Sequence, residues 1–215
     1  MVESAVKACE EFDTWHRAVD DWINTAAILD ESLERGIRGG FSKVRREQFL
    51  SHVGYQERYS DDCLAIGDEQ VLYRPTVLIR MCALVEARKR ARILVMGAGC
   101  GYLCAVLDAI GAQVFGIERV ISMAQATRKN LDKLGHHAVW IQSGDATKGW
   151  DDASPFDALI CCYPIAQEAE LPLHQMANGG LAVAPLQSQD GLRLALWEQS
   201  VGRVRRTIFE KVETP

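Results

Sequence analysis

The segment from Ile93 to Arg119, ILVMGAGCGYLCAVLDAIGAQVFGIER, constrains the fold of this chain more than any other. It begins with a short apolar run, Ile93 to Met96, which is typical of a buried parallel strand. Tyr102 to Ile110 has the apolar spacing of a helix, and a second apolar run covers Gln113 to Ile117. The order strand, turn, helix, strand predicts a parallel βαβ unit and therefore an α/β fold.

Three glycines, Gly97, Gly99 and Gly101, lie in the turn of this unit. Because glycine has no Cβ atom, the backbone can adopt positive φ there, and a ligand can reach the amides at the start of the helix. Glu118 ends the second strand, where a carboxylate can accept hydrogen bonds from both ribose hydroxyls of an adenosine group. The pattern therefore predicts a site for a nucleoside cofactor.

Dinucleotides and S-adenosylmethionine (SAM) share this kind of site, and two features favour SAM. The turn reads G-A-G-C-G, and Tyr102 stands where the dinucleotide motif G-x-G-x-x-G has its third glycine. Asp145 follows a third strand, where SAM enzymes place an acid against the adenine amino group. The alternative is a domain whose glycines only form tight turns. The predicted cofactor-binding residues are Gly97, Ala98, Gly99, Cys100, Gly101, Glu118, Arg119, Asp145, Ala146 and Cys161.

Charge and cysteine usage limit the partners of the chain. Its 215 residues carry a net charge of -5, which argues against a general nucleic-acid-binding surface. No apolar run reaches the length of a membrane span and the first residues lack a signal sequence, so we expect a cytoplasmic protein. None of the seven cysteines has zinc-ligand spacing, and we predict no metal site. The sequence does not indicate an oligomeric state.

The cysteine in the glycine turn, Cys100, differs from the others by its place. A thiol near a helix N-terminus can have a depressed pKa. A role in lining the cofactor pocket is favoured over a nucleophilic one, because no histidine stands nearby in the sequence.

The chain has no linker of low complexity, so we expect one structural unit. Residues 1–74 are predicted to form an N-terminal helical cap and lid, and residues 75–215 the SAM-binding domain. The predicted helices cover 12–35, 43–52, 75–89, 102–110, 120–134 and 168–176. The predicted strands cover 93–96, 113–117, 137–142, 156–162, 181–185, 192–199 and 203–210, the last two as an antiparallel hairpin. The segment 59–75 is expected to be irregular.

Eight segments, in order, resemble protein-L-isoaspartate O-methyltransferases over about 180 positions. ILVMGAGCGY is similar to VLEIGTGSGY, FGIER to YSIER, GDATKGW to GDGYEGW, FDALICC to FDRIIVT and NGGLAVAP to PGGRLVAP. Segments beginning at Arg35, Tyr59 and Gln70 are similar to the RGI, YxDxPLPIG and QTISQP-like motifs. The resemblance implies a doubly wound, Rossmann-like methyltransferase fold with a mostly parallel seven-stranded sheet, a C-terminal antiparallel hairpin and SAM as cofactor.

The chain departs from the family pattern at the positions that carry chemistry. Tyr73 stands where the family has its active-site serine or threonine, and Val95 stands where the family has an acid that holds the amino-acid end of SAM. Ala146 replaces a glycine. These changes predict weak or absent activity on isoaspartyl peptides.

Methyl transfer from SAM is an in-line displacement, so the protein mainly positions the reactants and excludes water. A carboxylate acceptor needs no general base, whereas an amine, phenol or carbon acceptor usually does. Candidate groups for such a role are Tyr73, Tyr163, His174 and Asp62. Tyr73 is the candidate catalytic residue, with a plug of an unused pocket as the alternative, and Arg74 and Tyr163 are candidate substrate residues.

The acceptor is expected to be a small molecule or a peptide. We expect it in a cleft roofed by the segment from Tyr59 to Pro75 and floored by Glu118, Asp145 and Cys161 to Tyr163. Three functions fit the sequence. The first is a SAM-dependent methyltransferase with an altered acceptor. The second is the same fold using SAM for natural-product tailoring or a displacement within SAM, and the third is a non-catalytic SAM-binding interaction protein.

Overall fold

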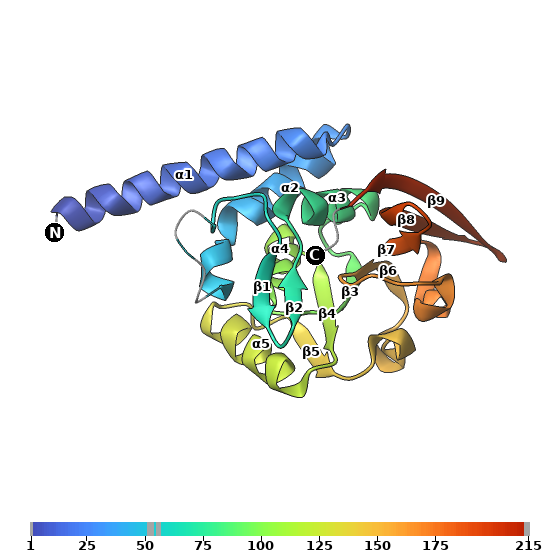
Figure 1. Ribbon diagram of the computed structural model, residues 1–215. Coiled ribbons are helices and arrows are strands. Elements are labelled where there is room, and N and C mark those ends of the chain that lie inside the picture. Colours follow the sequence, from blue (N-terminus) through green and yellow to red (C-terminus); the bar gives the residue numbers. More distant parts are fainter. Residues whose placement is uncertain (1, 51–53, 55–56, 213–215) are drawn as a thin grey trace.

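A twisted central sheet with helices packed against it forms the body of the molecule in the computed structural model, which describes residues 2–50, 54 and 57–212 (Figure 1). The α-helices are α1 (Val2–Ala26), α2 (Glu31–Lys43), α3 (Pro75–Leu84), α4 (Tyr102–Ile110) and α5 (Ile121–Lys133). The strands are β1 (Leu64–Gly67), β2 (Gln70–Leu72), β3 (Arg92–Met96), β4 (Gln113–Glu118), β5 (Trp140–Ser143), β6 (Phe156–Cys161), β7 (Met176–Ser188), β8 (Gly191–Ser200) and β9 (Arg203–Lys211).

The main sheet has the strand order β5-β4-β3-β6-β7-β8-β9. Strands β5, β4, β3, β6 and β7 are parallel to one another, whereas β8 is antiparallel to both β7 and β9. The predicted α/β fold with a mostly parallel seven-stranded sheet and a C-terminal antiparallel hairpin is therefore confirmed. Met96 of β3 pairs with Ile117 of β4, so the glycine turn and Glu118 emerge at the same edge of the sheet.

Apolar side chains cover both faces of the sheet, but different elements pack on each face. Ile93 and Val95 of β3 belong to the core that also holds residues of α1 to α5, including Trp15 and Phe41. Leu94 and Met96, which alternate with them, face a second cluster covered mainly by short 3-10 turns. These turns are η2 (Ala146–Lys148), η3 (Asp151–Ala153), η4 (Glu168–Glu170) and η5 (Leu173–Gln175).

The predicted helix over 168–176 is wrong, since η4 and η5 replace it. Pro172 lies between the two turns and cannot donate a helical hydrogen bond. The Glu168 carboxylate accepts a hydrogen bond from the buried Trp197 indole at 2.7 Å. This tertiary hydrogen bond therefore holds the segment against the sheet face that carries the second apolar cluster.

The single helix predicted over 12–35 is also wrong. The structure has two helices, with a break at Ala27, whose φ is 49°. Leu29, which fits the apolar stripe in the sequence, is 97% exposed. The Asp30 side chain accepts a hydrogen bond from the Leu33 amide at 2.7 Å and so caps α2. A local N-cap therefore overrides the continuous periodicity.

The N-terminal segments differ from expectation in two further places. The helix predicted over 43–52 is only the short turn η1 (Arg46–Phe49), and residues 51–52 lie outside the described part. The helix that begins at Pro75 ends at Leu84 rather than near Lys89. No helix in the described part is long and apolar enough to cross a membrane. Since α1 and α2 share a core with the sheet, the domain boundary at residue 74 stays a prediction.

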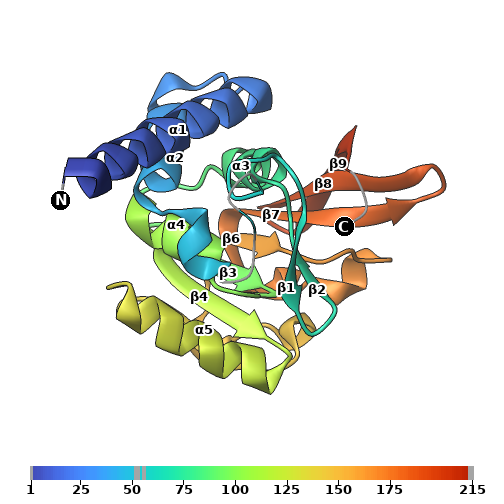
Figure 2. The same cartoon turned by 60° about the vertical axis from the view of Figure 1, so that its left-hand side comes forward.

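The segment 59–75, expected to be irregular, contains the antiparallel hairpin β1–β2, which lies over one end of the sheet (Figure 2). Its turn uses positive φ at Gly67, Asp68 and Glu69. The approach to the hairpin is held by Arg46, which is fully buried and donates to the Ser60 and Asp62 carbonyls at 2.8 and 2.7 Å. These bonds fix where the hairpin meets the glycine turn.

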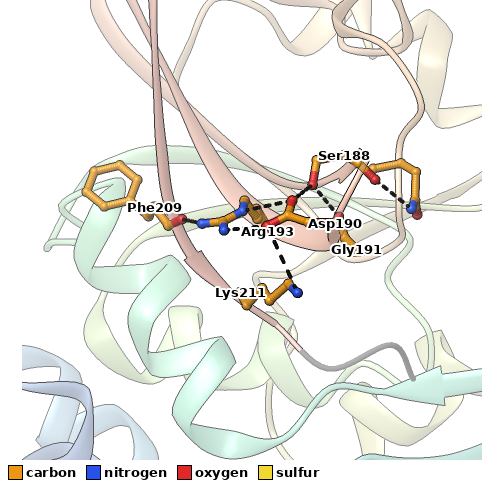
Figure 3. Close-up of polar contacts among 7 residues, drawn as sticks. Ser188, Asp190, Gly191, Arg193, Phe209 and Lys211 are labelled. Carbon is orange, nitrogen blue, oxygen red and sulfur yellow. Dashed lines mark hydrogen bonds and ion pairs between the residues drawn. The ribbon is translucent and has the colours of Figure 1, made fainter.

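The tight connection between β7 and β8 is closed by Asp190 (Figure 3). Its carboxylate accepts hydrogen bonds from the Ser188 hydroxyl at 2.6 Å and the Arg193 guanidinium at 2.7 Å. The same carboxylate lies 4.0 Å from the Lys211 ammonium on β9. These contacts keep the pKa of Asp190 well below its usual range, chiefly through the Arg193 hydrogen bond.

Candidate active site and cofactor pocket

The glycine turn between β3 and α4 is shaped by backbone conformations that favour glycine. Gly97, Gly99 and Gly101 have φ of 78°, 53° and 89°. A Cβ atom on Gly97 would lie 3.0 Å from the Tyr163 ring, and one on Gly99 would lie 2.9 Å from the Ile66 side chain. The turn therefore needs glycine both for its backbone and for the close approach of its neighbours.

Glu118 at the end of β4 supports this turn directly. Its side chain is 4% exposed, and its two carboxylate oxygens accept hydrogen bonds from the Gly99 and Val120 amides, each at 2.9 Å. Each carboxylate oxygen can accept a further hydrogen bond. The predicted contact with ribose hydroxyls is therefore compatible with the geometry and stays a prediction.

A pocket of about 430 Å³ opens beside the turn, a volume within the range of small-molecule sites. Five of the predicted cofactor residues line it: Gly97, Glu118, Arg119, Asp145 and Ala146. The other lining residues are Gln70, Ile117, Thr147, Tyr163, Pro164 and Glu170. The pocket thus brings the ends of β4, β5 and β6 together under the β1–β2 hairpin.

Asp145 projects from the end of β5 on the exposed side of the pocket. Its Oδ1 atom accepts hydrogen bonds from the Thr147 hydroxyl at 2.8 Å and the Thr147 amide at 3.0 Å. These two bonds lower the pKa of Asp145, with smaller contributions from Lys148 and Arg119. The carboxylate therefore remains ionised and able to accept a hydrogen bond from an amino group in the pocket.

Tyr73 lies in a much smaller cavity between the hairpin and the turn, which adjoins the larger pocket and shares Gly97, Glu118 and Tyr163 with it. This cavity has about 30 Å³ of space, and Ala98, Gly99 and Cys162 are among its lining residues. The Tyr73 side chain is 2% exposed, and its hydroxyl has no hydrogen-bond partner in the described part of the chain. Burial raises the pKa of Tyr73, followed by a smaller electrostatic contribution from Cys162. The phenol is therefore a protonated donor without an acceptor.

Tyr163 follows β6 and lines both the larger pocket and the small cavity. Its pKa is raised mainly by burial, and to a smaller extent by the Cys161 thiol and the Asp145 and Glu170 carboxylates. The pKa of Cys162 is also raised well above its usual range by burial. Neither side chain is therefore poised to remove a proton.

The other predicted residues lie elsewhere. Arg74 lines a different hollow of about 620 Å³, between α1, α3 and β9, and does not line the cofactor pocket. Cys100 lies in a third hollow against α5, where burial raises its pKa to about 11, the opposite direction from the effect that a helix N-terminus can have. Gly101 caps α4 and faces Thr127, whereas Cys161 is fully buried in the second core.

Three polar pocket residues were not predicted from the sequence. Gln70 lies in a segment with a family motif, so its place could have been inferred. Thr147 follows Asp145 directly and holds its carboxylate. Glu170 comes from η4 and has no motif around it, so no signal in the sequence pointed to it. His174 and Asp62, named as possible bases, line neither the pocket nor the small cavity.

The family model described as Protein-L-isoaspartate(D-aspartate) O-methyltransferase matches residues 27–213. The chain is similar to the protein-L-isoaspartate O-methyltransferase of Methylorubrum populi, with 36% identity over 172 residues, covering 80% of this chain and 76% of the relative. It is also similar to protein-L-isoaspartate O-methyltransferase 1 of Syntrophobacter fumaroxidans, with 30% identity and 90% of each chain covered.

Solved structures give the same fold. A protein-L-isoaspartate O-methyltransferase matches with a TM-score of 0.80 and 20% identity, covering 93% of this chain and 64% of that longer chain. A putative enzyme of this kind from Plasmodium falciparum, in complex with S-adenosyl-L-homocysteine, matches with a TM-score of 0.78 and 16% identity. This match covers 92% of this chain and 95% of that one.

Proposed function

This chain belongs to the protein-L-isoaspartate O-methyltransferase family, and from that premise we propose that it is a carboxyl methyltransferase with an altered acceptor. Membership makes it an enzyme of the SAM-dependent methyltransferase type. Which group receives the methyl depends on the residues around Tyr73. The main support for an altered acceptor is the Tyr73 phenol, which is buried, protonated and without a hydrogen-bond acceptor in the described residues.

The volume and the lining residues of the pocket are compatible with SAM. Its volume suits a nucleoside ligand, Gly97 leaves room against Tyr163, and Glu118 and Asp145 offer acceptors for hydroxyl and amino groups. When bound, SAM supplies a methyl group on a positively charged sulfur. The residues of this chain hold the ligand, orient the acceptor and exclude water.

The chemistry of the residues closest to Tyr73 favours a carboxylate acceptor. An amine, thiol or hydroxyl acceptor has a proton to lose, which requires a base nearby. Burial raises the pKa of Tyr73, Tyr163 and Cys162, so none of these takes up that role. A carboxylate is already ionised at neutral pH. The Tyr73 hydroxyl would donate a hydrogen bond to it and thereby orient it.

The size of the cavity supports a change of acceptor. Tyr73 occupies the position of a small hydroxyl residue in the family pattern, and the cavity beside it holds only about 30 Å³. An ordinary isoaspartyl peptide therefore fits poorly without displacement of the hairpin. Residues 73 and 74 are adjacent but line different hollows. We therefore propose that the acceptor carboxylate lies at Tyr73 and that the rest of the acceptor molecule lies in the hollow beside Arg74.

A second candidate function is favoured by the same small cavity. If Tyr73 closes the acceptor site permanently, the protein binds SAM without transferring its methyl group. The two candidates differ in whether any acceptor is labelled. A plug also predicts that activity returns when the ring is removed.

The test is incubation of the protein with methyl-labelled SAM and either a synthetic isoaspartyl peptide or proteins of a cell extract. The carboxyl methyltransferase predicts base-labile methyl esters in the extract and little or none on the peptide. Tyr73→Phe should lose most of this labelling, whereas Arg88→Gln, an exposed change away from the pocket, should not. Methyl groups stable to base refute the carboxylate acceptor. Labelling only with Tyr73→Ser supports the plug.

A further inference from the structure

The cofactor pocket carries an excess of negative charge on its walls. Three carboxylates line it, those of Glu118, Asp145 and Glu170, against one guanidinium, that of Arg119. Charges on the walls of a partly enclosed pocket act on a ligand more strongly than charges in open water. The three carboxylates are not equivalent, and their individual contacts decide which of them acts on a ligand.

Two of the three carboxylates are already balanced by their surroundings. Both oxygens of Glu118 accept hydrogen bonds from backbone amides of the turn. Asp145 is stabilised by Thr147 and lies within electrostatic reach of Lys148 and Arg119. The charge that these two groups present to a ligand is therefore reduced.

Glu170 is held differently. Its Oε1 atom accepts hydrogen bonds from the Ala166 and Gln167 amides at 2.8 and 3.0 Å, which fixes the carboxylate at the pocket wall. Unlike Glu118, which uses both oxygens, Glu170 accepts both amide hydrogen bonds on Oε1; in the described residues no hydrogen bond to its Oε2 atom and no ion pair with a lysine or arginine is found. Its charge is also the smallest contribution to the raised pKa of Tyr163, after burial, the Cys161 thiol and the Asp145 carboxylate, and the Tyr163 ring packs against Gly97 at the edge of the pocket. Glu170 thus places a fixed negative charge on the wall of the pocket that Tyr163 and Gly97 also line.

We propose that Glu170 makes the pocket select the positively charged methyl donor over its neutral product. This inference rests on the proposed function, because it takes SAM as the donor. SAM and S-adenosylhomocysteine (SAH) share every group except one methyl and one positive charge. Contacts with adenine, ribose and the amino-acid end are therefore common to both ligands, and their affinity ratio reports the electrostatic contribution.

The consequence is faster exchange of product for donor. When the methyl group leaves, the ligand loses its positive charge, and the attraction to Glu170 disappears with it. The pocket then holds the product more weakly than the donor. Glu170 is in this sense a specificity-determining residue that acts through its charge.

The experiment compares the dissociation constants of SAM and SAH by calorimetry for the wild type, Glu170→Gln and the control Glu198→Gln. Glutamine keeps an oxygen that accepts from the two amides and removes only the charge. Glu198 is a carboxylate on β8 paired with Arg205, away from the pocket. Glu170→Gln should lower the preference for SAM by on the order of fivefold, with little change for SAH. The control should keep the wild-type ratio.

Salt gives a second readout that does not depend on a variant. Raising the ionic strength should reduce the preference for SAM in the wild type, and should do so less in Glu170→Gln. An unchanged ratio in Glu170→Gln overturns this inference while leaving the proposed function intact. Failure of the wild type to bind either ligand overturns both.

Discussion

Replacing Tyr73 by phenylalanine should stabilise the protein in the absence of ligand. The hydroxyl is buried without a partner, while the ring fills the space between the hairpin and the turn. A buried polar group left unpaired costs about 1–3 kcal/mol, and phenylalanine keeps the ring while removing that group. We therefore expect the free energy of unfolding of Tyr73→Phe to rise by about 1 kcal/mol or more. For a chain of 215 residues, each such gain raises Tm by about 2–4 °C.

The measurement is urea unfolding followed by circular dichroism, with Tm from a thermal scan as a second readout. Tyr59→Phe is the matched control, because Tyr59 is only half-buried and its ring packs edge-on against Trp15, a contact that phenylalanine keeps. The control should show no gain. A Tyr73→Phe variant that is as stable as the wild type, or less stable, refutes the reasoning. Its hydroxyl would then already be paired in the ligand-free protein and would not await an acceptor.

Three further predictions concern the pocket and its supports. Glu118→Gln should weaken SAH binding about tenfold in calorimetry, because a charge-assisted hydrogen bond is lost, and unchanged affinity would exclude the ribose contact. Gly101→Ala should lower the free energy of unfolding, measured by urea unfolding, by about 1–3 kcal/mol, because φ is 89° and the new Cβ would lie 2.8 Å from Thr127; an unchanged free energy contradicts this. Arg193→Gln should raise the pKa of Asp190 toward its ordinary value, measured by NMR titration. Since the folded pKa is depressed, the stability that Asp190 provides exists above the unfolded pKa and is lost as pH falls through the folded one. A carboxyl that titrates as in the wild type would contradict the role of Arg193.

The sequence predicted the parallel part of the fold well, because each signal there is local. The apolar run of β3, the three glycines and the helical spacing of α4 all point to the same unit, and the structure has it with nearly the predicted bounds. Parallel strands also end at one edge of the sheet, which brought Gly97, Glu118 and Asp145 into one pocket. The parallel arrangement of the strands therefore brings motifs that are distant in the sequence to one pocket.

The errors arose where tertiary contacts override local patterns. The stripe through Leu29 continued the helical period, yet Asp30 capped a new helix there. The segment around Glu168 has a helical pattern, yet its bond to Trp197 and the proline that follows favour short turns. Glu170 could not have been predicted as a pocket residue, because it reaches the pocket only through the short turn η4, which replaces the predicted helix.

The most direct test of the account is a crystal structure of the protein with SAH. Adenosine should lie in the pocket lined by Gly97, Asp145 and Tyr163, with the Glu118 carboxylate on the ribose and Glu170 at the wall. The Tyr73 phenol should lie within contact distance of the ligand sulfur. A ligand bound outside this pocket, or a Tyr73 side chain turned away from the sulfur, would contradict both the cofactor site and the acceptor proposed from it.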